Sequence, residues 1–162
     1  MSETEPVREA SGRDAAAIAD LWTAAYVGEG EGGRTLPYSE ADFFETARRG
    51  RVFVAEQGDT VVGVVALSAP GAPGQAVAQA GEAELSRLVV SAPARQLGIG
   101  RALVGNCHEL ARASGWSAIA LWSRPYQTAA HRLYESLGYR RLPERDRVDD
   151  SGHERLALRL EL

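Results

Sequence analysis

The sequence has one cysteine, no lysine and no long hydrophobic run. A single cysteine, Cys107, excludes a disulfide within the chain and a cysteine-rich metal site, and we expect it to be a small packed residue. No apolar run approaches the roughly 20 residues that a membrane-spanning helix needs. Residues 1–10 are charged and lack the apolar centre of a signal peptide. These absences predict a protein of the reducing cytoplasm that does not associate with membranes.

The composition is that of an ordinary folded domain. The chain has 162 residues and is 44% hydrophobic, so folding can bury about two thirds of the unfolded chain's surface in one core. We therefore expect one domain over residues 1–162, and a homodimer is compatible with this composition. All 18 basic residues are arginine and alanine is abundant, which indicates the codon bias of a GC-rich bacterial genome.

The charge balance restricts the classes of partner. A net charge of −4 and a pI near 5.4 argue against a general nucleic-acid binder. The same balance mildly favours small cationic partners, although a solvated acidic surface is the simpler explanation.

Hydrophobic periodicity and turn residues predict a mixed α/β protein of the α+β type. We expect a central sheet of about seven strands flanked by about four helices, with antiparallel pairs on either side of one strand–helix–strand crossover. Residues 69–81, rich in Pro, Gly and Ala, are expected to be an irregular connection. The predicted strands are 6–10, 51–56, 60–67, 84–90, 117–122, 139–142 and 155–160, and the predicted helices are 11–26, 39–49, 100–113 and 128–137.

A few side chains receive predictions from local pattern alone. Phe43 and Phe44 are expected on the buried side of the 39–49 helix. His108 and His131 fall within helices and are interpreted as surface residues. Together with His153 they lack the spacing of a metal site, and none is predicted.

The segment Arg95-Gln96-Leu97-Gly98-Ile99-Gly100 joins a predicted strand to a predicted helix. Glycine there lets backbone approach a ligand closely, and the first amides of the helix are unpaired, so phosphate oxygens could bind. A tight turn without a ligand is the competing interpretation. No Gly-Lys-Ser/Thr follows, which excludes a nucleotide P-loop, and Leu103 replaces the third glycine of a dinucleotide-binding fold.

Two motifs in this part of the sequence resemble those of the GNAT acyltransferase superfamily. Residues 84–104 contain the Arg95–Gly100 loop, which is similar to the Arg/Gln-x-x-Gly-x-Gly/Ala loop that binds the pyrophosphate of acetyl-CoA in that family. Residues 130–139, Ala-His-Arg-Leu-Tyr-Glu-Ser-Leu-Gly-Tyr, resemble its Ala-x-x-Leu-Tyr-x-x-x-Gly-Phe/Tyr helix end. One departure is Gln127, where the family usually has an asparagine that holds the pantetheine arm. Glutamine carries the same amide on a longer stem.

The resemblance implies direct transfer of an acetyl group from acetyl-CoA, the co-substrate, to a primary amine. It implies that the Tyr134 hydroxyl protonates the leaving thiolate and that Glu84 or Glu82 accepts the proton of the amine. A backbone amide within residues 87–90 would polarise the thioester carbonyl. The residues implied for acetyl-CoA binding are Leu88, Val89, Val90, Arg95, Gln96, Leu97, Gly98, Ile99, Gly100, Arg101, Gln127 and Ala130.

Alternatives remain for individual residues and for the whole protein. Tyr134 also fits a core aromatic residue, and Glu82 fits a solvated charge at the strand entry. The chain also fits a catalytically silent acyl-CoA-binding or sensing module, whereas a nucleotide-binding oxidoreductase is disfavoured. The acceptor is expected to contact residues 28–37, the second helix and the hairpin near 145–153, with Glu29, Glu31, Asp42 and His153 as candidate contacts.

Overall fold

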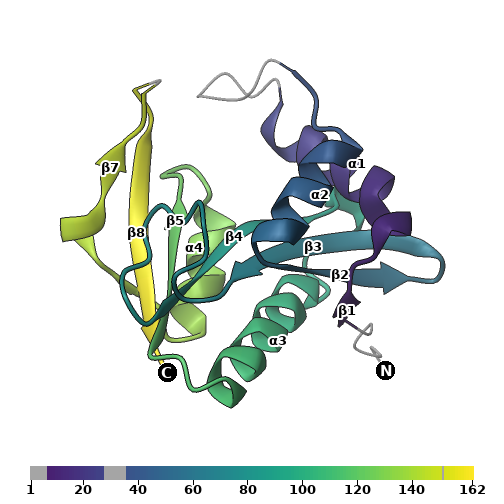
Figure 1. Cartoon of the computed structure of the whole chain (residues 1–162). Coiled ribbons are helices and arrows are strands. Elements are labelled where there is room, and N and C mark those ends of the chain that lie inside the picture. The colour runs from purple at the N-terminus through teal and green to yellow at the C-terminus, as the bar shows by residue number, and fades with distance from the viewer. Residues whose placement is uncertain (1–6, 28–35, 151) are drawn as a thin grey trace.

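The computed structural model describes residues 7–27, 36–150 and 152–162. Its described strands form one eight-stranded sheet in the order β1-β2-β3-β4-β5-β8-β6, with β7 paired to β8 (Figure 1). The strands are β1 (Val7–Glu9), β2 (Arg51–Gln57), β3 (Thr60–Ser68), β4 (Glu82–Val90), β5 (Ala118–Ser123), β6 (Arg140–Arg141), β7 (Arg147–Val148) and β8 (Glu154–Glu161). The helices are α1 (Ala15–Tyr26), α2 (Glu40–Arg49), α3 (Ile99–Ala113) and α4 (Thr128–Ser136).

Helices cover both faces of the sheet, because its central strands are apolar on both sides. On β3, Val64 packs into a cluster with Trp22 of α1 and Phe43 of α2, whereas its neighbour Val65 packs into a cluster with Leu103 of α3. Successive side chains of a strand point to opposite faces, so one strand serves both cores. Figure 1 shows α1 and α2 on one side of β2 and β3, and α3 on the other.

The predicted mixed sheet with about four flanking helices is confirmed. Strands β1 to β4 pair antiparallel, β4 and β5 pair parallel across α3, and β5, β8 and β6 pair antiparallel. Most predicted elements end within two residues of the observed ones. The two-residue strand β7 was not predicted, and β4 begins at Glu82 rather than Glu84.

The structure corrects two side-chain predictions. Phe44 is 50% exposed, whereas Phe43 is buried; the apolar stripe of a ten-residue helix is too narrow for both neighbours. His108 is buried rather than on the surface, and its Nε2 lies 3.0 Å from the Tyr139 hydroxyl. Burial lowers the pKa of His108 to about 4, so its ring is neutral at pH 7. Cys107 is buried, as predicted.

No helix in the described part of the chain has both the length and the apolar composition to cross a membrane.

Candidate functional site

Strands β4 and β5 separate soon after they meet. Only Glu82, Ala83 and Glu84 pair with β5, opposite Ala118 to Ala120, although β4 continues to Val90. From residue 85 onward β4 is therefore paired with β3 alone, and its other edge has no strand partner among the described residues. The predicted acetyl-CoA contacts Leu88, Val89 and Val90 lie in this part of β4. An extended ligand can hydrogen-bond there as an additional strand.

A β-bulge interrupts the same stretch of β4. Val64 is opposite Val89 and Ala66 is opposite Ser86, so the single residue Val65 faces two residues of β4, Arg87 and Leu88. Arg87 has a φ of 52°, in the left-handed region that residues with side chains rarely adopt.

The loop over residues 95–101 presents unpaired backbone donors. None of the N–H groups from residue 96 to residue 101 has a hydrogen-bond acceptor in the described structure. Gln96 and Gly98 have φ angles of 67° and 81°, and Gly98 is the N-cap of α3. The positive end of the α3 dipole lies at the same place, and the side chains of Arg95 and Arg101 are exposed. The arrangement is suited to an anion such as a pyrophosphate.

The two glycines of this loop have different surroundings. An added Cβ at Gly98 would meet nothing within 4 Å, whereas one at Gly100 would lie 3.2 Å from a methyl group of Leu133 in α4. Gly98 thus leaves open space above the loop. Gly100 allows α3 and α4 to pack closely, a role that the motif alone does not reveal.

Gln127 caps the entrance to α4 beside this edge. Its Oε1 accepts hydrogen bonds from the Ser123 hydroxyl, at 3.1 Å, and from the Arg124 amide, at 3.0 Å. Its amide nitrogen donates to no described residue and so retains its capacity to donate to a ligand. Ala130 lies one turn further along α4 and is half-buried against the α3 core.

Tyr134 is 5% exposed and packs at 5.4 Å, centroid to centroid, against the ring of Tyr139. Burial, with smaller contributions from Tyr26 and Cys107, raises the pKa of Tyr134 well above 10, so the phenol is protonated at neutral pH. Its hydroxyl has no hydrogen-bond partner among the described residues. The proton is therefore not committed to another group of the protein.

Glu82 is buried in a network of ion pairs. Its carboxylate lies 2.5 Å from Arg145 Nη1 and 2.7 Å from Arg159 Nε, and it accepts a hydrogen bond from the Gln79 amide. Burial alone would raise the pKa of Glu82, but these hydrogen bonds outweigh it and lower the pKa to about 2. Such a carboxylate is a weak base at neutral pH.

Glu84 is half-buried and anchors the 69–81 connection. Its Oε1 accepts N–H bonds from Ala76, Val77 and Ala78 at 2.6–3.0 Å, whereas the described contact of Oε2 is a longer one of 3.1 Å with Ala76. The carboxylate is thus fixed in position, and Oε2 accepts fewer hydrogen bonds than Oε1.

A cavity of about 280 Å³, here called the β4 cavity, lies beside the open edge. It brings Glu84 and Gln127 together, whereas Glu82 and Tyr134 are not among its lining residues. Several lining residues were not predicted, because they approach from α1, β5 and β8. The lining residues are Tyr26, Tyr38, Ala76, Val77, Glu84, Leu85, Ser86, Arg87, Trp122, Arg124, Gln127 and Arg155.

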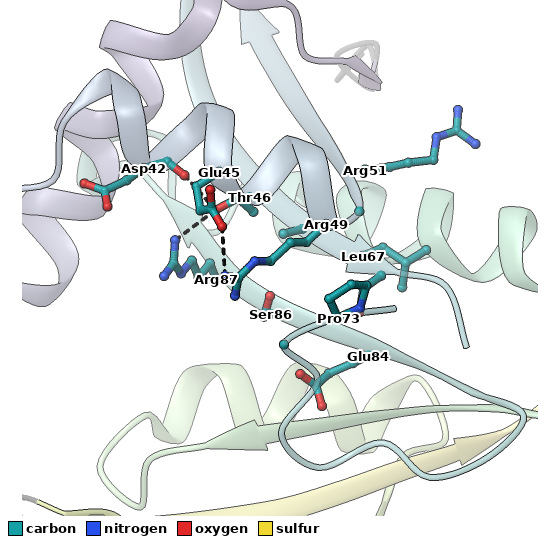
Figure 2. A pocket seen from close by; sticks show the side chains of 14 residues that line it. Asp42, Glu45, Thr46, Arg49, Arg51, Leu67, Pro73, Glu84, Ser86 and Arg87 are labelled. Atoms are coloured by element: carbon teal, nitrogen blue, oxygen red, sulfur yellow. Dashed lines mark hydrogen bonds and ion pairs between the residues drawn. The ribbon is translucent and has the colours of Figure 1, made fainter. Parts of the chain in front are cut away.

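A second hollow adjoins the first along β4. It lies between α2 and the 69–81 connection and shares Glu84, Ser86 and Arg87 with the β4 cavity (Figure 2). Asp42 lines this hollow, and its carboxylate accepts the N–H of Ser39 as a helix cap. Glu29 and Glu31 lie outside the described residues. His153 is half-buried beside Asp149 and does not line either hollow.

No group of three or more His, Cys, Asp or Glu residues in the described ranges is arranged to hold a metal ion.

Comparison with known proteins gives one family and one fold. A model of the acetyltransferase (GNAT) family matches residues 15–139. N-acetylaspartate synthetase of Danio rerio is 43% identical over 61 residues, 38% of this chain and 22% of that protein. N-acetyltransferase family 8 member 3 of Rattus norvegicus is 34% identical over 92 residues, 57% of this chain and 39% of that protein. The matches thus span well under half the length of these relatives.

Solved structures with the same fold cover nearly the whole chain. The phosphinothricin acetyltransferase of Sinorhizobium meliloti, solved with acetyl-CoA, superposes with a TM-score of 0.78 at 19% identity, covering 99% of this chain and 89% of that one. The ribosomal-protein-alanine N-acetyltransferase of Brucella melitensis gives 0.76 at 22% identity, covering 97% and 99%. At these identities the likeness concerns the fold.

Proposed function

Because this chain belongs to the GNAT acetyltransferase family, we propose that it transfers the acetyl group of acetyl-CoA to a primary amine by direct attack. The observation that carries the proposal is the open edge of β4 beyond Glu84, which runs toward the unpaired amides of residues 96–101. Acetyl-CoA binds with its pantetheine arm along Leu88, Val89 and Val90 and with its pyrophosphate on the loop. The Gln127 amide donates to the arm.

In the reaction, the neutral amine attacks the thioester carbonyl, a C–N bond forms and the C–S bond breaks. A backbone amide within residues 87–90 stabilises the negative charge that develops on the carbonyl oxygen. The Tyr134 hydroxyl donates its proton to the leaving thiolate, which its unshared proton allows. Holding both reactants side by side supplies a large part of the rate.

Glu84 accepts the proton of the amine, directly or through water. Its support is its place on the wall of the β4 cavity and its fixed carboxylate. Glu82 is the weaker candidate, because Arg145 and Arg159 hold its carboxylate and its pKa is about 2.

The test is release of free CoA thiol from acetyl-CoA in the presence of a panel of primary amines, with Tyr134→Phe as the matched variant. Wild-type protein is expected to turn over at least one amine, and loss of the hydroxyl should lower kcat about 10²–10⁴-fold. The affinity for acetyl-CoA should hardly change, because the ring remains.

Two results would go against this proposal. Binding of CoA without turnover of any amine would favour the silent sensing module. Near-normal kcat with a lowered melting temperature in Tyr134→Phe would make Tyr134 a core residue only.

A further inference from the structure

The Arg87 side chain is held in one place at the wall of the β4 cavity. Its guanidinium lies 4.9 Å from the ring centroid of Trp22 and 5.4 Å from that of Tyr38, and Nη1 donates to the Thr46 hydroxyl at 3.1 Å. Figure 2 shows this hydrogen bond from β4 to α2. A guanidinium has five N–H donors, so most of those of Arg87 have no described acceptor.

No carboxylate of the described residues pairs with this cation. Other half-buried arginines do have such partners: Arg8 binds Asp14 and Glu56, Arg155 binds Asp149, and Arg145 and Arg159 bind Glu82. Arg87 is also half-buried, but among the described residues it contacts only a hydroxyl and two aromatic rings. The positive charge of Arg87 is therefore not neutralised by a described carboxylate, and a ligand with a negative charge can supply the counter-ion.

The backbone at Arg87 points to the same conclusion. Its φ of 52° at the β4 bulge is strained for a residue with a side chain. Backbone strain of this kind is found at ligand sites in proteins.

The cavity as a whole carries charges of both signs. Glu84 supplies the negative group, and Arg87, Arg124 and Arg155 supply the positive ones. Arg155 is neutralised by Asp149, and Arg124 donates to the Tyr126 hydroxyl. At about 280 Å³ the cavity has room for a small molecule rather than for a folded partner.

We infer that the acceptor is a small amine that carries a carboxylate and has the size of a free amino acid. Arg87 binds this carboxylate through two parallel hydrogen bonds. The inference rests on the proposed function for its reaction, but the binding it describes does not depend on turnover. The amine is oriented toward the open edge of β4 and Glu84. A planar guanidinium matches a carboxylate with two parallel hydrogen bonds, which a carboxamide cannot reproduce.

The test compares amino acids with their carboxamides in two assays, calorimetric binding to the CoA-bound protein and acetyl transfer. Wild-type protein is expected to bind at least one free acid about 10- to 100-fold more tightly than its carboxamide. Arg87→Gln should remove this preference and leave CoA affinity unchanged. Arg48→Gln is the control, since Arg48 is an exposed partner of Glu45 on α2.

If Arg87→Gln fails to fold, Arg87→Lys is used instead. Lysine keeps the positive charge but lacks the planar pair of donors, so the preference for the acid over its carboxamide should weaken several-fold. Equal binding of acids and carboxamides, or an acid preference that survives both substitutions, would overturn the inference. Arg87-dependent binding of an acid without acetyl transfer would support the inference and contradict the proposed function, which keeps the two failures distinct.

Discussion

Glu82 and Glu84 are two residues apart on β4 and carry the same functional group. Their surroundings nevertheless suit Glu82 to a structural ion pair and Glu84 to contact with a ligand. Side chains two apart on a strand share a face, so sequence alone treats them as a pair. Glu82 is 4% exposed and bonded to Arg145 and Arg159, whereas Glu84 is half-buried, held by backbone amides and in contact with the β4 cavity. The two carboxylates differ because Arg145 and Arg159, from the last third of the chain, pair with Glu82 and not with Glu84.

The same substitution at these two positions should therefore have different consequences. Glu84→Gln keeps an oxygen for the amides of Ala76 to Ala78 but cannot accept a proton. We expect kcat to fall about 10²-fold at pH 7. The loss should shrink toward pH 9, where more of the amine is already neutral. A pH–rate profile of both variants checks this, and an unaltered profile in Glu84→Gln would leave a water chain as the base.

Glu82→Gln should act on stability instead, because it leaves two arginines without their carboxylate. We expect the unfolding free energy at pH 7 to fall by roughly 2–4 kcal/mol. A carboxylate with a lowered folded-state pKa stabilises above its unfolded value of 4.5, and this contribution disappears as pH falls toward about 2. In urea denaturation, the difference between wild type and Glu82→Gln should therefore narrow between pH 5 and pH 2. A difference that stays constant across this range would contradict the assigned ion pairs.

Among the helices and strands, the junction of β4 and α3 is where the predicted and the observed structure agree most closely. The loop, its left-handed Gly98 and the start of α3 follow from local chemistry that a short motif can specify. The open edge of β4 depends on where β5 diverges, which the register of the two strands displays.

Gly98 offers a direct test of this junction. Gly98→Val would place a side chain in the open space above the loop and would strain a φ of 81°. We expect CoA affinity, measured by calorimetry, to fall at least about 10-fold, the scale of losing one or two charge-assisted hydrogen bonds. Gly105→Ala is the control, since Gly105 lies within α3 with nothing near an added Cβ. Unchanged CoA affinity in Gly98→Val would remove the loop from the binding site.

What sequence reasoning missed depends on contacts between distant segments. Phe44 follows the apolar pattern but faces outward, because Phe43 already fills the contact of α2 with the sheet. His108 is polar and buried because Tyr139, 31 residues later, supplies its hydrogen bond. The role of Arg87 has no local sequence signature, because its contacts Trp22 and Thr46 lie in two helices much earlier in the chain.

In the whole molecule, the arrangement of the sheet connects the β4 cavity to the loop at α3. Strands β1 to β4 and strands β5, β8 and β6 are joined through three residue pairs of β4 and β5, and the two sets diverge beyond them (Figure 1). The helices pack on both faces, so the divergence leaves backbone groups of β4 exposed without opening either core. The same edge runs from Glu84 at the β4 cavity to the loop at α3.

We propose that acetyl-CoA occupies this edge and this loop together, and hydrogen exchange with and without CoA tests this binding mode. We expect slower exchange at the amides of residues 96–101, because the ligand supplies acceptors that the described residues lack. We expect the same at those amides of residues 88–90 that point away from β3. Exchange in the β2–β3 hairpin, whose amides are already paired, should not respond locally. If saturating CoA protects neither segment, or protects a different surface, acetyl-CoA does not bind along this edge and loop.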